Sequence, residues 1–225
     1  MPDSLKRELN SSLEAIAIKS SIKLDNGQLH VSEYFNNLLE EISQNKKNFI
    51  FKFFTKSNVN SDCKGIYLYG GVGRGKSMIM DLFFRHAPVK EKRRLHFHDF
   101  MKEVHQRILE KSKKERNKDS VLLVAKDLAS SAKLLCFDEM EIKDIADAMI
   151  LSRLFQIMFD EGIILVTTSN QHPDGLYKNG LHRERILPFI DKLKLKTNII
   201  KIPNGEDWRE RSLSGKKVWL SPLNK

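Results

Sequence analysis

The chain has 225 residues, of which 40% are hydrophobic and 30% are charged, a composition that is typical of a folded globular protein and excludes a disordered one. This length allows one α/β domain with a continuous core, alone or with a short appendage. No apolar run approaches the ~20 residues that a membrane-spanning helix needs, and residues 1–15 lack the apolar segment of a secretory signal. The two cysteines, Cys63 and Cys136, are too few for a disulfide framework, so the composition predicts reduced thiols in a cytoplasmic protein.

The formal net charge of +10 at pH 7 favours contact with acidic partners. Much of the excess lies in residues 90–94, in residues 111–118 and toward the C-terminus. A solvated basic face is one interpretation of this charge, and binding to nucleic acid or another anionic surface is the alternative. The sequence has no basic motif interleaved with aromatic residues and no zinc-finger spacing, so no motif supports the alternative.

Residues 1–60 predict a helical prefix. Apolar residues recur there at helical spacing, at Leu5, Leu9, Leu13 and Ile16 and again at Val31, Phe35, Leu38, Leu39 and Ile42. The polar segment 58–62 is expected to end the prefix before the first buried strand. We therefore expect two parts, the prefix over residues 1–60 and a core domain over residues 61–225.

Short apolar segments and helical patterns alternate through the expected core domain. Strands are predicted over residues 65–70, 93–100, 133–139, 163–170 and 198–203. Helices are predicted over residues 76–85, from the second strand through Ile108, over residues 121–129, and over residues 144–160 with Ile145, Ala148, Met149, Phe155, Met158 and Phe159 on one stripe. Such alternation is typical of a parallel sheet covered by helices on both faces, in which ligands bind at the carboxyl ends of the strands.

A phosphate-binding loop is predicted between the first strand and the first helix of this domain. The segment 70–77 fits the pattern G-x-x-x-x-G-K-[ST] in full, and the residues that we expect to bind nucleotide are Gly70, Gly71, Val72, Gly73, Arg74, Gly75, Lys76 and Ser77. Its glycines let backbone N–H groups turn toward phosphate oxygens, and the helix that starts near Lys76 adds its positive end. Lys76 is expected to reach the β- and γ-phosphates of ATP, and the Ser77 hydroxyl to ligate Mg²⁺. The alternatives are a ligand-free glycine-rich turn for the loop and a solvated side chain for Arg74.

Two carboxylates end the third predicted strand, where they resemble a Walker B element. Asp138 is expected to hold the Mg²⁺ shell, and Glu139 to orient or deprotonate the attacking water. Two acids at the start of a helix are favourable in any case, which is the alternative. The second acid favours ATP hydrolysis, because a kinase that transfers phosphoryl to a bound acceptor needs no water-activating glutamate here.

Three further polar residues are candidates for the same site. Asn170 ends the next strand and is expected to position the water or sense the γ-phosphate, unless it is an ordinary strand-to-loop residue. Arg183 and Arg185 fall before or within a later helix and could reach a neighbouring subunit as an arginine finger, with a solvated arginine as the alternative. The histidines at 96, 98 and 105 lack partners at metal-ligand spacing, so a zinc site is disfavoured.

Several strings of this sequence are specific beyond a generic phosphate-binding loop. They include GIYLYGGVGRGKSMIMDLFF, RRLHFHDFM, LLCFDE, DIADAMILSRLF, LVTTSN and PDGLYKNGLHRERILPFI, which run in order from about residue 66 to residue 190. With LDNGQ at 24–28, they resemble the ZapE family of AAA+-type P-loop ATPases, bacterial cell-division proteins with mitochondrial relatives. The resemblance implies an AAA+-like parallel sheet and a homo-oligomer, in which Arg183 matches the arginine-finger position better than Arg185.

The resemblance also implies a function, which is a Mg²⁺-dependent ATPase that couples its nucleotide cycle to a protein partner. In bacteria that partner would be a division-ring protein and the site of action the cytoplasm, whereas eukaryotic relatives imply the mitochondrion. Relatives continue beyond the segment that matches 207–209 into a C-terminal helical region, so we expect a core without a C-terminal lid domain and weaker hydrolysis. The alternative is a nucleotide-dependent loader or adaptor that binds nucleic acid with slow or no hydrolysis.

Overall fold

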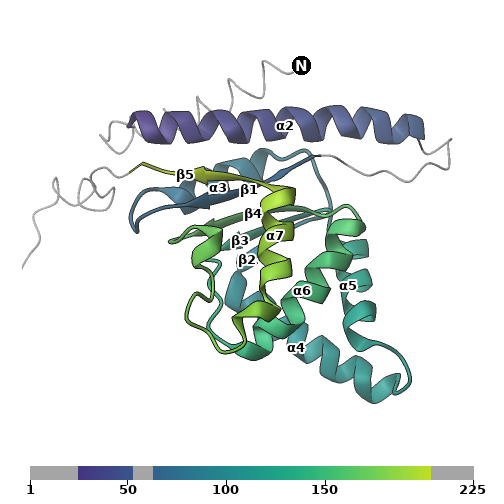
Figure 1. Cartoon of the computed structure of the whole chain (residues 1–225). Coiled ribbons are helices and arrows are strands. Elements are labelled where there is room, and N and C mark those ends of the chain that lie inside the picture. Colours follow the sequence, from purple (N-terminus) through teal and green to yellow (C-terminus); the bar gives the residue numbers. More distant parts are fainter. Residues whose placement is uncertain (1–24, 53–62, 204–225) are drawn as a thin grey trace, which may run out of the picture.

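The computed structural model describes residues 25–52 and 63–203, with the backbone alone for residues 45–52. The strands form one parallel sheet in the order β2-β3-β4-β1-β5 (Figure 1). Their bounds are Gly65–Tyr69 (β1), Lys92–His96 (β2), Leu134–Asp138 (β3), Ile164–Ser169 (β4) and Thr197–Lys201 (β5). The helices are α2 (Asn26–Lys52), α3 (Lys76–His86), α4 (Phe97–Lys114), α5 (Ser120–Ser131), α6 (Ile145–Asp160) and α7 (Leu187–Lys196), with 3₁₀ turns η1 (Pro173–Gly175) and η2 (Arg183–Arg185).

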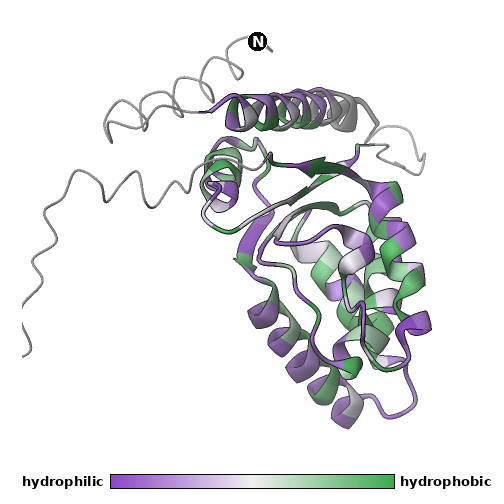
Figure 2. Ribbon diagram, turned by 60° about the vertical axis from the view of Figure 1, so that its left-hand side comes forward, coloured by the Kyte–Doolittle hydropathy of each residue, from purple (hydrophilic) through white to green (hydrophobic). Residues whose placement is uncertain are grey.

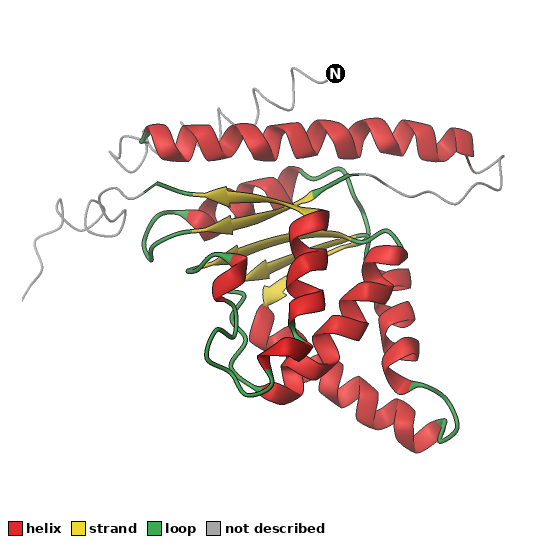
Figure 3. Ribbon diagram, in the orientation of Figure 1, coloured by secondary structure: helices red, strands yellow, loops and turns green. Residues whose placement is uncertain are grey.

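The sheet lies between two layers of helices, as the alternation of strands and helices predicted. Helices α2 and α3 cover one face, and α4 to α7 cover the other (Figures 1 and 3). Successive side chains of a strand point to opposite faces. On β1, Tyr67 therefore packs under α4 to α7, whereas Ile66 and Leu68 pack under α2 and α3. Figure 2 shows the central strands β1, β3 and β4 as mostly hydrophobic, because both of their faces are buried, whereas the edge strand β2 is mostly hydrophilic.

The second half of the predicted prefix forms helix α2. All five of its predicted apolar residues are buried, namely Val31, Phe35, Leu38, Leu39 and Ile42. The Phe35 ring lies 5.2 Å from the Phe83 ring of α3, centroid to centroid. This helix therefore belongs to the same hydrophobic core as β1 and α3. The first predicted apolar set, from Leu5 to Ile16, lies outside the described residues, and the division of the chain at residue 60 stays a prediction.

A cluster of aromatic rings fixes the end of β3 on the opposite face. Phe137 lies 4.6 Å from Phe100 of α4 and 6.2 Å from Phe155 of α6, measured between ring centroids. All three rings are buried. Tilted and edge-to-face aromatic pairs add to the stability gained from burial alone. Because Phe137 directly precedes Asp138, this cluster also fixes the position of the acidic pair.

Two sequence predictions of local structure are wrong. The second strand was expected over residues 93–100, but β2 ends at His96 and Phe97 begins helix α4. An apolar-polar alternation in a short window suits a strand or a helix start, and packing of Phe97 and Phe100 against Phe137 selects the helix. Met149 was expected in the buried stripe of α6, but it is 49% exposed.

Candidate functional site

The predicted phosphate-binding loop, acidic pair and Asn170 lie together at the carboxyl edge of the sheet. Strand β4 lies between β1 and β3, with Leu68 of β1 opposite Thr168 and Phe137 of β3 opposite Thr167. The loop after β1 and the acids at the end of β3 therefore flank the end of β4. A cavity of about 210 Å³ lies between them. Its lining residues are Val72, Gly73, Arg74, Gly75, Lys76, Ser77, Met78, Glu139, Thr168, Ser169 and Asn170.

The loop has a backbone conformation that requires glycine. Gly75 has φ +81° and directly precedes the first residue of α3. Gly70 has φ +148°, and a Cβ there would lie 2.5 Å from Ile202 Cγ2. Left-handed φ values and close contacts of this kind exclude most side chains. Helix α3 begins directly after this loop, so the unpaired N–H groups of its first turn face the cavity. These N–H groups favour the binding of an anion there.

Lys76 connects the loop to Asn170. Its Nζ donates hydrogen bonds to the carbonyl oxygens of Gly70 at 2.8 Å and Gly71 at 2.7 Å, and to Asn170 Oδ1 at 3.1 Å. The side chain of Asn170 thus lies at the same ammonium group that is expected to reach phosphate. Thr168 and Ser169 line the same cavity, and Asn170 adds a hydrogen bond to the Lys76 ammonium.

Asp138 has one carboxylate oxygen bonded and one without a partner. Its Oδ2 accepts a hydrogen bond from Arg94 Nε at 3.0 Å, whereas Oδ1 is buried and has no hydrogen-bond partner among the described residues. Buried polar atoms are nearly always satisfied, so an unpartnered one needs a physical explanation, and a bound ion is one such explanation. A carboxylate oxygen is a preferred ligand of Mg²⁺. The unpartnered Oδ1 fits a metal that would be shared with Ser77 and with phosphate oxygens.

Arg94 is a site residue that the sequence analysis missed. Besides Asp138, its guanidinium bonds the Asp81 carboxylate and donates to the Ser77 carbonyl oxygen at 3.3 Å. It therefore ties β2 and β3 to α3, the helix that begins with the loop lysine. Arg94 lies in the basic run of β2, Lys92–His96, so no local signal in the sequence separates it from its neighbours.

Glu139 has a strained backbone at the edge of the cavity. Its φ is +54°, in the left-handed region that is unfavourable for a residue with a Cβ. Thr168 holds this conformation, because its Oγ1 accepts from the Glu139 N–H at 3.1 Å and its carbonyl oxygen accepts from the Met140 N–H at 2.7 Å. Strain of this kind clusters at functional sites, where the surrounding structure fixes a side-chain direction. The Glu139 side chain is exposed and lines the cavity.

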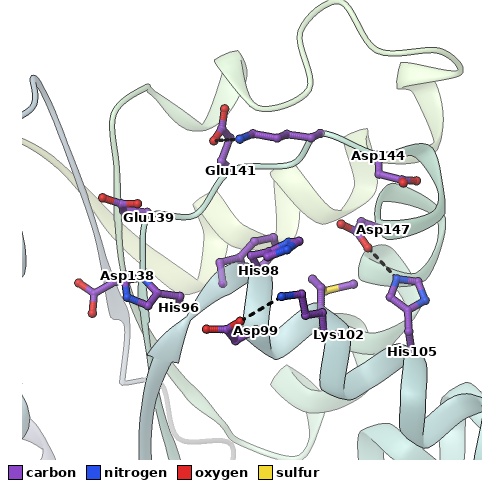
Figure 4. Close-up of a pocket in the computed structure, with 13 residues that line it drawn as sticks. His96, His98, Asp99, Lys102, His105, Asp138, Glu139, Glu141, Asp144 and Asp147 are labelled. Atoms are coloured by element: carbon purple, nitrogen blue, oxygen red, sulfur yellow. Dashed lines mark hydrogen bonds and ion pairs between the residues drawn. The ribbon is translucent and has the colours of Figure 1, made fainter.

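Asp138 and Glu139 also border a larger cavity of about 640 Å³, formed by the start of α4 and the segment before α6 (Figure 4). Figure 4 shows these two acids on one side of the cavity and His105 on the other, where His105 Nε2 lies 2.7 Å from Asp147 Oδ1. Within the described part of the chain, no group of three or more His, Cys, Asp or Glu side chains could hold a metal ion. The histidines at 96 and 98 line this cavity as well.

Arg74 is not a solvated side chain, so this alternative to a role in nucleotide binding is wrong. Its side chain is only 5% exposed, and Nη2 lies 2.7 Å from Asp25 Oδ2. The Nε atom donates to the Pro203 carbonyl oxygen at 3.2 Å. The guanidinium therefore bonds the start of α2 and the segment after β5, although Arg74 also belongs to the cavity wall.

Arg183 and Arg185 do not line the cavity that holds Lys76 and Asn170. Arg183 lies in η2, where its Nη2 donates to the Asp174 carbonyl oxygen at 2.5 Å and its Nε has no partner among the described residues. Arg185 is exposed. Neither arginine reaches the site of its own chain, so a role as an arginine finger depends on a second chain.

The basic segment 90–94 is not simply a solvated face. Lys92 Nζ donates to the carbonyl oxygens of Phe84 at 2.6 Å and Ala87 at 2.9 Å, at the C-terminal end of α3. Arg93 pairs with Glu103 through two hydrogen bonds, and Arg94 pairs with Asp138. These three cations stabilise the fold and the site, so they contribute less to a surface for anions than the net charge suggested.

The chain is similar to one protein family and to proteins from a bacterium and a fish. A family model described as AFG1-like ATPase matches residues 8–225. The chain is 44% identical over 161 residues to the cell division protein ZapE of Escherichia coli K12, covering 72% of this chain and 42% of that protein. It is 42% identical over 168 residues to lactation elevated protein 1 homolog B of Danio rerio, covering 70% of this chain and 33% of that protein. The chain thus spans well under half the length of these two relatives.

Solved structures are similar in fold. The crystal structure of DnaI superposes with a TM-score of 0.57 at 14% identity, covering 93% of this chain and 94% of that chain. Domain III of the replication initiation protein DnaA from Thermotoga maritima gives a TM-score of 0.56 at 13% identity, covering 85% and 70%. At this level of identity the likeness shows the fold alone, which is that of the P-loop NTPases. The predicted parallel sheet flanked by helices is therefore confirmed, whereas the expected lack of a C-terminal lid domain concerns residues outside the described ones and stays a prediction.

Proposed function

The chain belongs to the AFG1-like ATPase family, and from this premise we propose that it binds ATP with Mg²⁺ at residues 70–77 and hydrolyses it. The observation that carries the proposal is the convergence of four groups at one edge of the sheet. These are the Lys76 ammonium, the unpartnered Asp138 Oδ1, the exposed Glu139 carboxylate and the Asn170 amide. They come from three different strands or their loops, and their only evident common purpose is a phosphorylated ligand.

The residues around the cavity take distinct roles in binding. The N–H groups of the glycine-rich loop and of the first turn of α3 bind phosphate oxygens, and Lys76 exchanges its loop carbonyl partners for the β- and γ-phosphates. Ser77 Oγ and Asp138 Oδ1 would hold Mg²⁺, which when bound neutralises negative charge on the phosphate oxygens. Arg94 retains Asp138 Oδ2, so the carboxylate keeps a fixed orientation toward the metal.

Glu139 and Asn170 act on the water. The exposed Glu139 carboxylate accepts a hydrogen bond from the attacking water and takes its proton as the water oxygen bonds to the γ-phosphorus. The bond from that phosphorus to the β,γ-bridging oxygen breaks, and ADP leaves with the electron pair of that bond. The amide of Asn170, held at Lys76, orients that water or contacts the γ-phosphate. Because Thr168 fixes the Glu139 backbone, the Glu139 side chain leaves the main chain from a fixed position at the edge of the cavity.

The cellular role is proposed from the relatives. The name of the Escherichia coli relative connects it to cell division, so we propose that this chain couples its nucleotide cycle to a division-ring protein in a bacterial cytoplasm. We further propose a homo-oligomer in which Arg183 approaches the γ-phosphate of a neighbouring copy. No helix in the described part of the chain has the length and apolar character needed to cross a bilayer.

Steady-state phosphate release by the full chain tests the enzymatic proposal. We expect turnover that depends on Mg²⁺, loss of ATP binding in Lys76→Ala, and in Glu139→Gln tight ATP binding with turnover lowered by about 100-fold or more. Glu141→Gln is the matched control, because Glu141 is a nearby carboxylate that pairs with Lys143 instead of facing the loop. Equal phosphate release from wild type, Lys76→Ala and Glu139→Gln would show that the proposed site is wrong.

Nucleotide-dependent binding to nucleic acid is the second candidate function, motivated by the net charge of +10. The internal pairing of Lys92, Arg93 and Arg94 weakens that motive. The likeness to DnaI and DnaA does not strengthen it, since it concerns the fold alone. A DNA affinity that requires ATP and falls steeply with salt would support this function, and absence of binding at low salt would exclude it.

A further inference from the structure

The back of the phosphate-binding loop is held by two segments that are distant in sequence. In Figure 1 the start of α2 and the end of β5 lie at the same edge of the sheet as the carboxyl ends of the strands. Arg74 is the loop residue that reaches both, through Asp25 at 2.7 Å and the Pro203 carbonyl oxygen at 3.2 Å. Neither contact involves a residue of the catalytic pair or the metal site.

Gln28 adds a bond to the loop backbone itself. Its Nε2 donates to the Arg74 carbonyl oxygen at 3.3 Å, and the residue is only 2% exposed. A Cβ on Gly75 would lie 3.2 Å from the same nitrogen, so the amide packs directly against the loop. Segments outside the loop therefore contact the side chain of Arg74 and the main chain of Arg74 and Gly75.

Asp25 and Gln28 are themselves fixed by the helix that they begin. Asp25 Oδ1 accepts from the Gln28 N–H at 2.7 Å, and the Asp25 N–H donates to Gln28 Oε1 at 3.3 Å. This reciprocal pair satisfies donors at the start of α2 in the manner of a capping box. Because α2 is anchored in the core by Phe35 and Leu39, the pair is a rigid support and not a loose contact.

We propose that Asp25, Gln28 and Arg74 form a clamp that positions the backbone of residues 70–75 for phosphate binding. They are positioning residues, since their polar groups bond the loop and its neighbours and the metal and catalytic roles belong to other side chains. The inference rests on the proposed binding of ATP to this loop. It gives residues at the start of helix α2, which are distant from the loop in sequence, a role in the affinity for nucleotide.

The clamp and a direct effect of charge predict opposite results for Asp25. If Arg74 acted only through its positive charge on the phosphates, removal of the Asp25 carboxylate would strengthen ATP binding, because a nearby negative charge is lost. If the clamp positions the loop, Asp25→Ala must weaken ATP binding, since the Arg74 guanidinium loses its ion pair with the start of α2. The sign of the change therefore separates the two explanations.

Equilibrium binding of ATP to the full chain provides the test. We expect Asp25→Ala and Arg74→Ala each to raise the Kd by about tenfold, the loss that corresponds to one hydrogen bond of a charged group. Gln28→Met should raise the Kd by about fivefold, because its hydrogen bond joins two neutral groups. Asp25→Ala combined with Arg74→Ala is expected to match the single variants, because both changes open the same contact. Arg74→Lys should restore part of the affinity. Gln28→Met removes the amide without a change of charge. The matched control is Asp160→Ala, which breaks an exposed ion pair with Lys192 on the far side of the fold.

Hydrogen exchange of the loop amides without nucleotide gives a readout that does not need ATP. We expect faster exchange over residues 70–76 in the clamp variants and wild-type exchange in Asp160→Ala, with unchanged folding by circular dichroism. Wild-type exchange in Asp25→Ala and Gln28→Met, or an unchanged or lowered Kd in Asp25→Ala, would overturn the clamp. If wild type binds no ATP, the proposed function fails, and the exchange rates still decide the clamp.

Discussion

Replacement of Arg94 by alanine tests whether residues of the proposed nucleotide site also stabilise the fold. The guanidinium bonds the carboxylates of Asp138 and Asp81 and the carbonyl oxygen of Ser77, so one substitution disconnects β3 from α3. The Asp138 side chain is 10% exposed and its Oδ1 already lacks a partner among the described residues. Arg94→Ala therefore leaves a nearly buried carboxylate without a hydrogen-bond partner among the described residues.

The size of the effect follows from the exposure of each partner. Asp81 is about one third exposed and retains Arg85, so water and that arginine replace most of what it loses. Asp138 has no such replacement, and a lost hydrogen bond to a buried charged group costs about 1.5 to 3 kcal/mol. Because Arg94 is 22% exposed, we take the lower half of that range, about 2 kcal/mol for the variant as a whole.

Urea unfolding measured without nucleotide or Mg²⁺ is the assay. With an m-value of about 2 kcal/mol/M, the midpoint should fall by roughly 1 M in Arg94→Ala. The neighbouring Arg93→Ala is the matched control, since Arg93 also pairs with a carboxylate but both partners are more exposed, at 30% and 25%. That variant should lose about 1 kcal/mol or less.

A double-mutant cycle with Asp138→Ala isolates the pair. We expect a coupling of 1 kcal/mol or more, because each single change breaks the same contact; this size is on the order seen for residues in one salt-bridge network. Additive losses in the double variant, or an Arg94→Ala midpoint no lower than that of Arg93→Ala, would refute the role that we assign to Arg94.

Three further predictions concern pH, thiol chemistry and strain. The hydrogen bond from Arg93 holds the pKa of Glu103 below its usual range, so the stability lost in Glu103→Gln, read from unfolding midpoints, should be constant above about pH 5 and disappear as pH falls below about 4. Burial, reinforced by the Glu41 carboxylate, raises the pKa of the Cys63 thiol to about 12, so alkylation at pH 8 should be at least 100-fold slower in the folded chain than in urea, a conservative figure on the order expected from the thiolate fraction. Glycine suits the left-handed backbone at 139, so Glu139→Gly should unfold at higher urea than Glu139→Ala by about 1 kcal/mol of stability, although both should lose turnover. A loss of stability in Glu103→Gln that does not change with pH would contradict the first expectation. Fast alkylation of Cys63 in the folded chain would contradict the second, and equal urea midpoints of Glu139→Gly and Glu139→Ala would contradict the third.

Local patterns in the sequence were sufficient for most elements of the fold. Buried strands of a parallel sheet appear as short apolar runs, and the runs at 133–139 and 163–170 contain β3 and β4. The spacing of Val31, Phe35 and Ile42 similarly predicted the buried face of α2. The boundary between β2 and α4 could not be predicted in this way, because the ring of Phe97 packs against Phe137, which lies forty residues further along the chain.

The sequence by itself was enough to predict a phosphate-binding loop, because the glycine-rich backbone followed by Lys76 and Ser77 lies within one short segment. The acidic pair was predicted in the same way, from two adjacent residues at the end of one apolar run. What the side chains beside that segment do was decided only by the tertiary structure. Arg74 would read as a solvated or ligand-binding residue from its position in the loop, yet its partner Asp25 lies 49 residues earlier in the chain. Arg94 reads as part of a basic run, yet it bonds Asp138, 44 residues later. Such pairings depend on which strands become neighbours and which helix covers which face, and residue spacing along the chain carries no information about a hydrogen bond formed between distant segments.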